Sequence, residues 1–320
     1  MNNILFIKKY QPENIEDFNL NPKLLNIINT FIELDNINII LVGDSGCGKS
    51  TLIEAIIKKY YQGIKPCSYK QNILYVNNLN GNGLEYYRND VKTFCQTHSS
   101  ISKKKKVVVL DDIDFINDQL QQVLRNIIDK YSSSIHFIAS CSSIQKIIIN
   151  LQSRFNLLKI PSINRDDMIR IMDKIVESEN IVIEPIVKEQ LLNISNNTIK
   201  TLINYLEKIK LVNKCVTMNM LEKICTNISF TLLDEYTSLI KQKQLKEAIR
   251  LVQSLYDIGY SVVDILDNYF FYIKYTNTVS DNEKYKIIPY ICKYITIFND
   301  IHEDEIELSL FTNNLINVLT

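Results

Sequence analysis

The sequence predicts an α/β fold, a parallel sheet flanked by helices, followed by helical regions in the second half of the chain. Three observations predict it. A loop rich in glycine joins a short apolar run to a helical pattern at residues 43–51. A second apolar run, residues 107–110, ends in acidic residues. From residue 228 onward the apolar residues have the spacing of amphipathic helices.

Composition narrows the class of protein. The 320 residues are enough for two or three domains with their own cores. Thirty-six basic and thirty-six acidic side chains cancel, so a nucleic-acid site would have to be a local basic patch. No apolar run approaches the roughly 18 residues that span a membrane. Seven scattered cysteines without a CxxC pair indicate reduced thiols, and we expect an intracellular protein that is not secreted.

Glycine gives the sharpest motif. Only seven glycines occur, and Gly43, Gly46 and Gly48 fall within six positions. The loop "GDSGCGKST" fits the pattern G-x-x-x-x-G-K-[ST] in full. An apolar, β-branched run precedes it at residues 37–42, and a helical pattern follows at residues 51–59. Strand, loop and helix are the context that a phosphate-binding loop requires. The alternative is a simple glycine turn between strand and helix. At average residue frequencies, the full pattern arises by chance in roughly one chain per hundred.

A loop of this kind predicts nucleotide binding. Backbone N–H groups at the helix start face the β- and γ-phosphates. Lys49 is expected to reach the same phosphates, and the Ser50 hydroxyl to bind Mg²⁺. The expected cofactors are therefore ATP and Mg²⁺. The predicted nucleotide-binding residues of the loop are Gly43, Asp44, Ser45, Gly46, Cys47, Gly48, Lys49, Ser50 and Thr51.

The second motif is "VVVLDDID", residues 107–114. Asp111 closes the predicted strand and is expected to hold Mg²⁺, while Asp112 is placed to orient the attacking water. The alternative is a strand end with solvated carboxylates. A helical pattern follows in which Gln121 lies on the polar side, and the next strand pattern, "SSIHFIASCSS", ends in small polar residues. This order predicts a parallel sheet with its ligand at the carboxyl ends of the strands.

Four collinear segments then carry a family resemblance. "FIKKYQP" (6–12) is similar to W-x-E-K-Y-R-P, and "VNNLNGNGLEYYRNDVKTF" (76–94) to L-N-A-S-D-D-R-G-I-x-x-V-R-x-x-I-K-x-F. "LDDIDFINDQLQQVLRNIID" (110–129) is similar to L-D-E-A-D-x-M-T-x-x-A-Q-Q-A-L-R-R-x-M-E, and "KIIINLQSRF" (146–155) to K-I-I-x-P-L-Q-S-R-C. The chain thereby resembles a small subunit of replication factor C, the AAA+ clamp loader of eukaryotes and archaea. Its excess of Ile, Asn and Lys suggests an AT-rich genome, such as that of some large DNA viruses or protists.

The resemblance implies roles for further residues. Tyr10 and Pro12 would lie near the adenine, although Gln11 replaces the family's Arg. Ser142 takes the sensor-1 position, usually Asn, and Lys200 takes the place of the sensor-2 Arg. Asp112 stands where the family has Glu. These departures leave the efficiency of hydrolysis open.

Two more implied roles concern other molecules. Arg154 would be an arginine finger that reaches the ATP of a neighbouring subunit, whereas by itself it reads as a surface ion pair. If residues 84–94 are helical, Arg88, Asn89 and Lys92 share one side, and the resemblance makes them contacts to DNA phosphates. The alternative is a solvated helical face. Lys103 to Lys106 either add to this patch or form a solvated loop.

The resemblance also divides the chain and names its partners. We expect an AAA+ nucleotide-binding domain at residues 1–161, a helical lid at 162–226 and a helical collar at 227–320. The implied partners are sister subunits in a five-membered ring, a sliding clamp and primer–template DNA, with no membrane, at the site of DNA replication. The implied function is ATP-dependent loading of the clamp. The alternatives are a structural ring subunit that barely hydrolyses ATP, another AAA+ DNA-processing ATPase, and a small-molecule P-loop kinase, which fits least.

Overall fold

The computed structural model describes residues 5–77, 84–195, 198–212, 220–221, 228, 230–276, 278–298 and 302–319. The chain divides into two compact units, Met1–Val216 and Thr217–Thr320. The first contains the sheet and the second is helical. In the described part of the chain, no helix is long and apolar enough to cross a membrane.

The sheet of the first unit has five parallel strands in the order β2-β3-β4-β1-β5. The strands are β1 (Ile39–Val42), β2 (Ile73–Asn77), β3 (Lys106–Asp111), β4 (Ile135–Cys141) and β5 (Asn156–Lys159). The glycine loop follows β1 and the acidic motif ends β3, with β4 between these two strands. The predicted parallel sheet is confirmed, and both motifs lie at its carboxyl edge.

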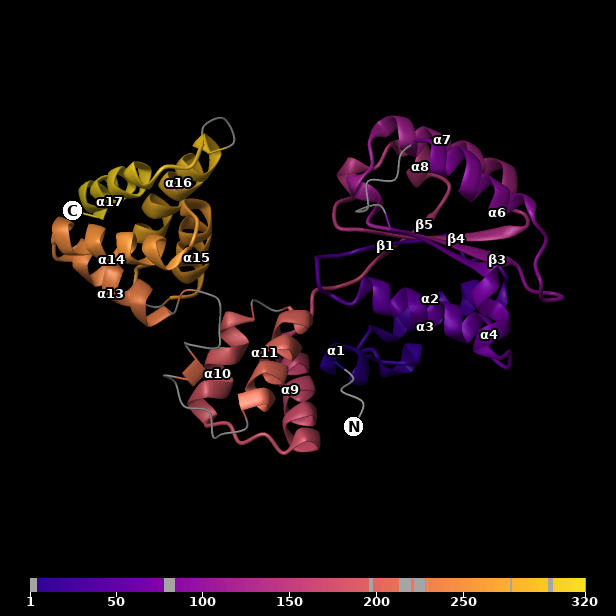
Figure 1. The fold of residues 1–320 in the computed structure, drawn as a ribbon, viewed down its shortest axis with the longest axis horizontal. Helices are drawn as coiled ribbons and strands as arrows, with labels where there is room; N and C mark the ends of the chain where they lie inside the picture. The colour runs from indigo at the N-terminus through magenta and orange to yellow at the C-terminus, as the bar shows by residue number, and fades with distance from the viewer. Residues whose placement is uncertain are drawn as a thin grey trace. The chain divides into compact units, whose positions relative to one another are not determined.

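Successive residues of the strands face opposite layers of helices. Val108 and Leu110 of β3 belong to one apolar core, and Val107 and Val109 to the other. Such two-sided burial explains why the parallel strands read as continuous apolar runs. Figure 1 shows one layer of helices on each face of the sheet. One layer contains α2 (Pro22–Glu33), α3 (Lys49–Tyr60) and α4 (Pro66–Tyr69), and the other α6 (Lys92–Gln96), α7 (Asp118–Tyr131) and α8 (Ile149–Gln152).

Helix α7 corrects one prediction from the sequence. Leu120, Leu124, Ile127 and Ile128 are buried as their spacing predicts. Gln121, however, is fully buried rather than on the polar side. Its side-chain amide donates to the carbonyl oxygens of Ile116 and Lys146, and its oxygen accepts from the Ile148 N–H. A buried amide is stable there because all its partners are present.

The first unit ends in a helical part. It contains α9 (Arg165–Glu179), α10 (Pro185–Ile194) and α11 (Ile199–Val212). The short N-terminal helix α1 (Phe6–Lys9) is tied to it, because Lys9 Nζ and Tyr10 OH both donate to Glu179 Oε1, the latter at 2.6 Å. The predicted boundary near residue 226 lies outside the described residues.

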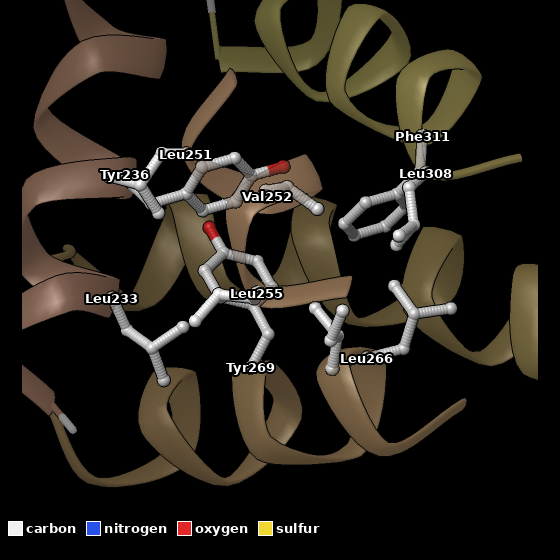
Figure 2. Close-up of a pocket in the computed structure, with 10 residues that line it drawn as sticks. Leu233, Tyr236, Leu251, Val252, Leu255, Leu266, Tyr269, Leu308 and Phe311 are labelled. Carbon is white, nitrogen blue, oxygen red and sulfur yellow. The ribbon is translucent and has the colours of Figure 1, made fainter. Parts of the chain in front are cut away.

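The second unit has its own apolar core. Its described helices are α13 (Phe230–Lys241), α14 (Leu245–Ile258), α15 (Val262–Tyr275), α16 (Asp281–Ile297) and α17 (Glu305–Leu319). Figure 2 shows aliphatic and aromatic side chains that line a void in this core. The volume of the void is about 10 Å³. This volume is at the lower limit for one water molecule, so the void is a packing defect in the core rather than a binding site.

Candidate nucleotide-binding site

The glycine loop has the backbone that its sequence predicts. Gly46 and Gly48 have φ of 78° and 92°, in the left-handed region that glycine enters without steric cost. Gly48 is the N-cap of α3, so the first free N–H groups of that helix point into the loop. A Cβ on Gly46 would come within 2.4 Å of Thr198 Cγ2, at the start of α11. A side chain at position 46 would therefore push the helical part away from the loop.

Lys49 and Ser50 follow directly. Lys49 is buried, and its ammonium donates to the carbonyl oxygens of Gly43 and Asp44 at 2.8 and 3.0 Å. Ser50 Oγ donates to the Asp111 carboxylate, at 3.1 Å from Oδ2. The two residues predicted to bind magnesium, from motifs 61 positions apart, thus lie in contact.

A cavity of about 890 Å³ opens over the loop. Its walls come from the glycine loop, the N-terminal segment and the helical part, and it is large enough for a nucleotide. Among the residues that line it are Tyr10, Gln11, Pro12, Ser45, Gly46, Cys47, Gly48, Lys49, Ser50, Thr51, Asp112, Lys174 and Lys200. Gln11, at the family's Arg position, donates to Glu54 of α3 at 2.7 Å.

Asp112 lies in this cavity wall with an unusual backbone. Its φ of 53° and ψ of 55° are in the left-handed region, which aspartate tolerates better than most residues. Burial raises the pKa of the Asp112 carboxyl, and the neighbouring Asp111 charge raises it further. A carboxylate with a raised pKa accepts a proton more readily, which suits a general base.

At the end of β4, the polar residues contact two different aspartates. Ser140 contacts Asp111, and the backbone of Ser142 and Ser143 contacts Asp114. Ser142 is exposed and is not among the residues that line the cavity. Its N–H and that of Ser143 donate to Asp114 Oδ2 at 3.2 and 3.3 Å. Asp114 is buried, and its Oδ1 has no hydrogen-bond partner among the described residues. Asp114 therefore holds the backbone of the loop that carries the predicted sensor 1.

The sequence interpretation gave no role to Ser140. This serine is fully buried, donates to Asp111 Oδ1 and accepts from the Asp112 N–H at 2.9 Å. A serine in the stretch "FIASC", among apolar residues of β4, was the available signal, because a buried hydroxyl needs a polar partner. Glu179, which holds Lys9 and Tyr10, gave no comparable signal, because an acid near the end of an amphipathic helix is ordinary.

Arg154 lies outside the cavity wall. Its Nε donates to Asp129 Oδ1 at 2.7 Å, and its Nη1 donates to Ser153 Oγ at 2.8 Å. Arg125 Nε is 3.4 Å from the other oxygen of Asp129. The alternative interpretation of Arg154 as a surface ion pair thus describes its contacts within this chain. About one-third of the Arg154 side chain is exposed.

The residues predicted to contact DNA are all exposed. Arg88 and Asn89 belong to a π-helical segment, Tyr87–Val91, and Lys92 begins α6. Tyr87 and Val91 are buried and fix the opposite side. Residues 78–83 of the same motif lie outside the described residues.

The lysine run at 103–106 is largely engaged within the fold. Lys104 Nζ lies 4.1 Å from the centre of the Tyr60 ring, and Lys105 Nζ lies 3.1 Å from Asp35 Oδ2. Lys106 is buried, and its ammonium donates to the Phe94 carbonyl at 3.1 Å. Lys104, Lys105 and Lys106 therefore form neither a solvated loop nor a free basic patch, because each contacts another part of the fold. Lys103 is exposed.

Comparison with known proteins adds two family matches. Residues 39–160 match the ATPase family associated with various cellular activities (AAA). Residues 230–295, in the second unit, match the replication factor C C-terminal domain. The first match covers the sheet with both motifs, and the second covers α13–α15 and most of α16.

Individual relatives agree with these matches. The chain is 24% identical over 315 residues to the replication factor C small subunit of Sulfolobus acidocaldarius, covering 98% of this chain and 95% of the relative. It is 25% identical over 288 residues to a protein named as a replication factor C small subunit from Acanthamoeba polyphaga mimivirus, covering 90% and 88%. The Methanococcus vannielii replication factor C small subunit is 25% identical and covers 89% and 90%.

Solved structures bear on the fold alone. The RuvB Holliday junction branch migration motor of Thermotoga maritima has a TM-score of 0.54 at 14% identity, covering 77% of this chain and 85% of that one. This likeness shows that the two chains share a fold. The two family matches and the near full-length relatives agree: the chain is similar to replication factor C small subunits along nearly its whole length, and its sheet with both motifs matches the AAA family.

Proposed function

We propose that the chain binds ATP and acts with sister subunits to load a sliding clamp onto primer–template DNA. The observation that carries this proposal is the contact between Ser50 and Asp111 beside the glycine loop, in a chain whose second unit matches the replication factor C C-terminal domain. We further propose the division into a nucleotide-binding domain (1–161), a lid (162–226) and a collar (227–320).

The residues present fit ATP with Mg²⁺. Mg²⁺ in nucleotide enzymes is bound by one or two protein oxygens together with substrate phosphates, and the Ser50 hydroxyl and Asp111 carboxylate form such a pair. When bound, the ion neutralises negative charge on the phosphates. Lys49 would exchange its two loop carbonyls for phosphate oxygens, and Lys200 would bring a cation from the lid. Tyr10 and Pro12, which line the cavity, would lie beside the adenine of ATP.

The chemical step is hydrolysis of the γ-phosphate. Asp112 would orient the attacking water, with Ser142 as the sensor near the same phosphate. Arg154 would act on the ATP of a neighbouring subunit, after leaving Asp129. This exchange costs little, because an ion pair that is open to solvent is weak.

The experiment uses the chain assembled with its sister subunits. ATP turnover is measured with and without clamp and primed DNA, for the wild type, Lys49→Ala and Arg154→Ala. We expect clamp and DNA to stimulate turnover, and both substitutions to abolish the stimulated loading of the clamp. Arg125→Ala is a matched control, because Arg125 shares Asp129 but does not belong to the predicted finger motif. Absence of stimulation by clamp and DNA in every combination would refute clamp loading.

One specific observation favours a second function, that of a structural ring subunit which binds ATP and hydrolyses it slowly. Asp112 is one methylene shorter than the family's Glu, and its backbone is held in the left-handed region. Loss of loading in Arg154→Ala together with normal loading in Lys49→Ala would favour this structural role.

A further inference from the structure

We propose that Ser140 is a positioning residue for hydrolysis, which fixes the carboxylate of Asp111 and the backbone of Asp112 relative to each other. The inference rests on the proposed function of the nucleotide site. In this proposal the buried Ser140 hydroxyl positions both Asp111 and Asp112, although Ser140 itself does not line the cavity.

The hydroxyl of Ser140 joins the two acids directly. It donates its proton to Asp111 Oδ1 and accepts from the Asp112 N–H at 2.9 Å. Ser50 Oγ lies 3.1 Å from the other oxygen, Oδ2, and 3.3 Å from Oδ1 of the same Asp111 carboxylate. Ser140 and Ser50 therefore hold the Asp111 carboxylate between them, with Ser50 at the start of α3 beside the glycine loop.

The position of Ser140 in the sheet explains how it reaches both acids. Strand β4 lies between β3, which carries the acids, and β1, which carries the glycine loop, and Ser140 pairs with Leu41 of β1. Ile138, two residues earlier, belongs to the core on the α3 side of the sheet. Because side chains alternate along a strand, Ser140 faces the same side, where α3 begins with Lys49 and Ser50.

The backbone of Asp112 needs such a partner. A non-glycine residue in the left-handed region is strained and persists when surrounding contacts hold it. The N–H of Asp112 has one such contact in Ser140 Oγ. Without it, the turn after β3 can relax, and the Asp112 carboxylate moves relative to Asp111. A small misplacement of a catalytic group is enough to slow a reaction strongly.

The test compares Ser140→Ala with Ser195→Ala in the assembled complex. Ser195 is a matched control, since it is also buried and also donates one hydrogen bond, to the Leu192 carbonyl at 2.9 Å. We expect Ser140→Ala to lower kcat by about 10- to 100-fold with little change in KM for ATP, because the group that is displaced acts on the water. Ser195→Ala is expected to lower thermal stability without this fall in kcat.

A second measurement does not depend on turnover. Mn²⁺ affinity is measured in the presence of a non-hydrolysable ATP analogue, from the electron paramagnetic resonance signal of free Mn²⁺. We expect Ser140→Ala to weaken Mn²⁺ binding while Ser195→Ala does not, because only Ser140 holds Asp111. If Ser140→Ala does not fold, Ser140→Cys, which has a similar shape and a weaker hydrogen bond, replaces it with the same expected directions.

The outcomes separate this inference from the proposed function. Equal effects of Ser140→Ala and Ser195→Ala on kcat and on Mn²⁺ affinity would overturn the role of Ser140. Failure of clamp and DNA to stimulate the wild type would refute clamp loading and leave the comparison of the two serine variants intact. If the wild type shows no turnover, the Mn²⁺ measurement alone decides.

Discussion

Asp112 combines a short carboxylate with a left-handed backbone. Aspartate and asparagine tolerate this backbone better than longer side chains do, because their short polar groups bond locally. Glutamate at this position would reach about one methylene further toward the water and would add backbone strain. At position 112, a longer side chain would therefore bring the carboxylate closer to the water but would also increase the strain in the backbone.

We expect Asp112→Glu to raise ATP turnover and to lower the melting temperature slightly. Asp112→Asn keeps the backbone preference but cannot accept a proton, so turnover should fall by about 100-fold or more while nucleotide binding persists. Steady-state turnover, a fluorescent ATP analogue and thermal melts measure these effects. Unchanged turnover in Asp112→Glu would place the rate limit at Ser142 or Lys200 instead.

A second cluster lies at the opposite, amino-terminal edge of the sheet. The buried His136 of β4 has its Nε2 3.0 Å from Asp35 Oδ1, and its Nδ1 accepts from the Ile37 N–H at 3.4 Å. Tyr60 OH donates to the same Asp35 oxygen at 2.7 Å. Burial lowers the pKa of His136, although Asp35 opposes that shift. With Nδ1 accepting, the neutral ring donates from Nε2.

This cluster predicts a loss of stability in mild acid. The unfolded histidine takes up a proton near pH 6.5, whereas the folded ring resists it, so unfolding becomes easier as the pH falls below about 6.5. Denaturant melts between pH 8 and pH 5 measure this slope. Replacement His136→Gln should flatten it, and replacement of the exposed His98 by Gln should not. Equal slopes in both variants would rule out His136 as the cause.

Among the elements, α7 is anchored by one amide. The Gln121 side chain forms hydrogen bonds with the segment before α7, at Ile116, and with the segment before α8, at Lys146 and Ile148. We expect Gln121→Leu to lower the free energy of unfolding by about 3 kcal/mol, because it leaves buried backbone groups without partners. Gln122→Leu, on the exposed side of the same helix, is the control and should change it little. Urea melts measure both.

The segment Tyr87–Lys92 and the lysine run make contrasting predictions for DNA. If Arg88 and Lys92 contact phosphates, Arg88→Ala and Lys92→Ala should each weaken binding to all primed sequences alike, and lower the salt slope of log K by about 1. The exposed Lys103→Ala is the control, with no change expected. Fluorescence anisotropy at several salt concentrations measures the slopes, and an unchanged slope in both variants would exclude phosphate contacts by this segment.

The sequence predicted the elements around its motifs well and the polar side chains between them poorly. The strand, loop and helix at residues 39–60 follow from glycine spacing and apolar periodicity, which are local signals. Gln121 and Lys106 were assigned to solvent because their types are usually exposed. Their burial depends on carbonyl groups of Lys146 and Phe94, whose positions are set only by the folded chain.

For the whole molecule, the two units should unfold separately. The core of the second unit consists of residues from that unit alone. We expect a fragment of residues 217–320 to fold and melt cooperatively. In the full chain, ATP with Mg²⁺ at a hundredfold excess over Kd should raise the free energy of unfolding of the first unit by about 2.7 kcal/mol. The melting temperature of the second unit should not change. Calorimetry measures both, and a single transition shifted as a whole would contradict separate units.

The strand order has a consequence for how the protein is made. Strand β1 pairs only with β4 and β5, whose residues lie about a hundred positions further along the chain, as in Ile39 with Ile138 and Asn156. Contacts this distant in sequence form slowly, because a long loop must close first. During synthesis the central strand therefore stays unpaired until residues 135–159 have left the ribosome. The glycine loop is therefore synthesised well before the strands that flank β1, and it becomes able to hold a phosphate only after they have paired.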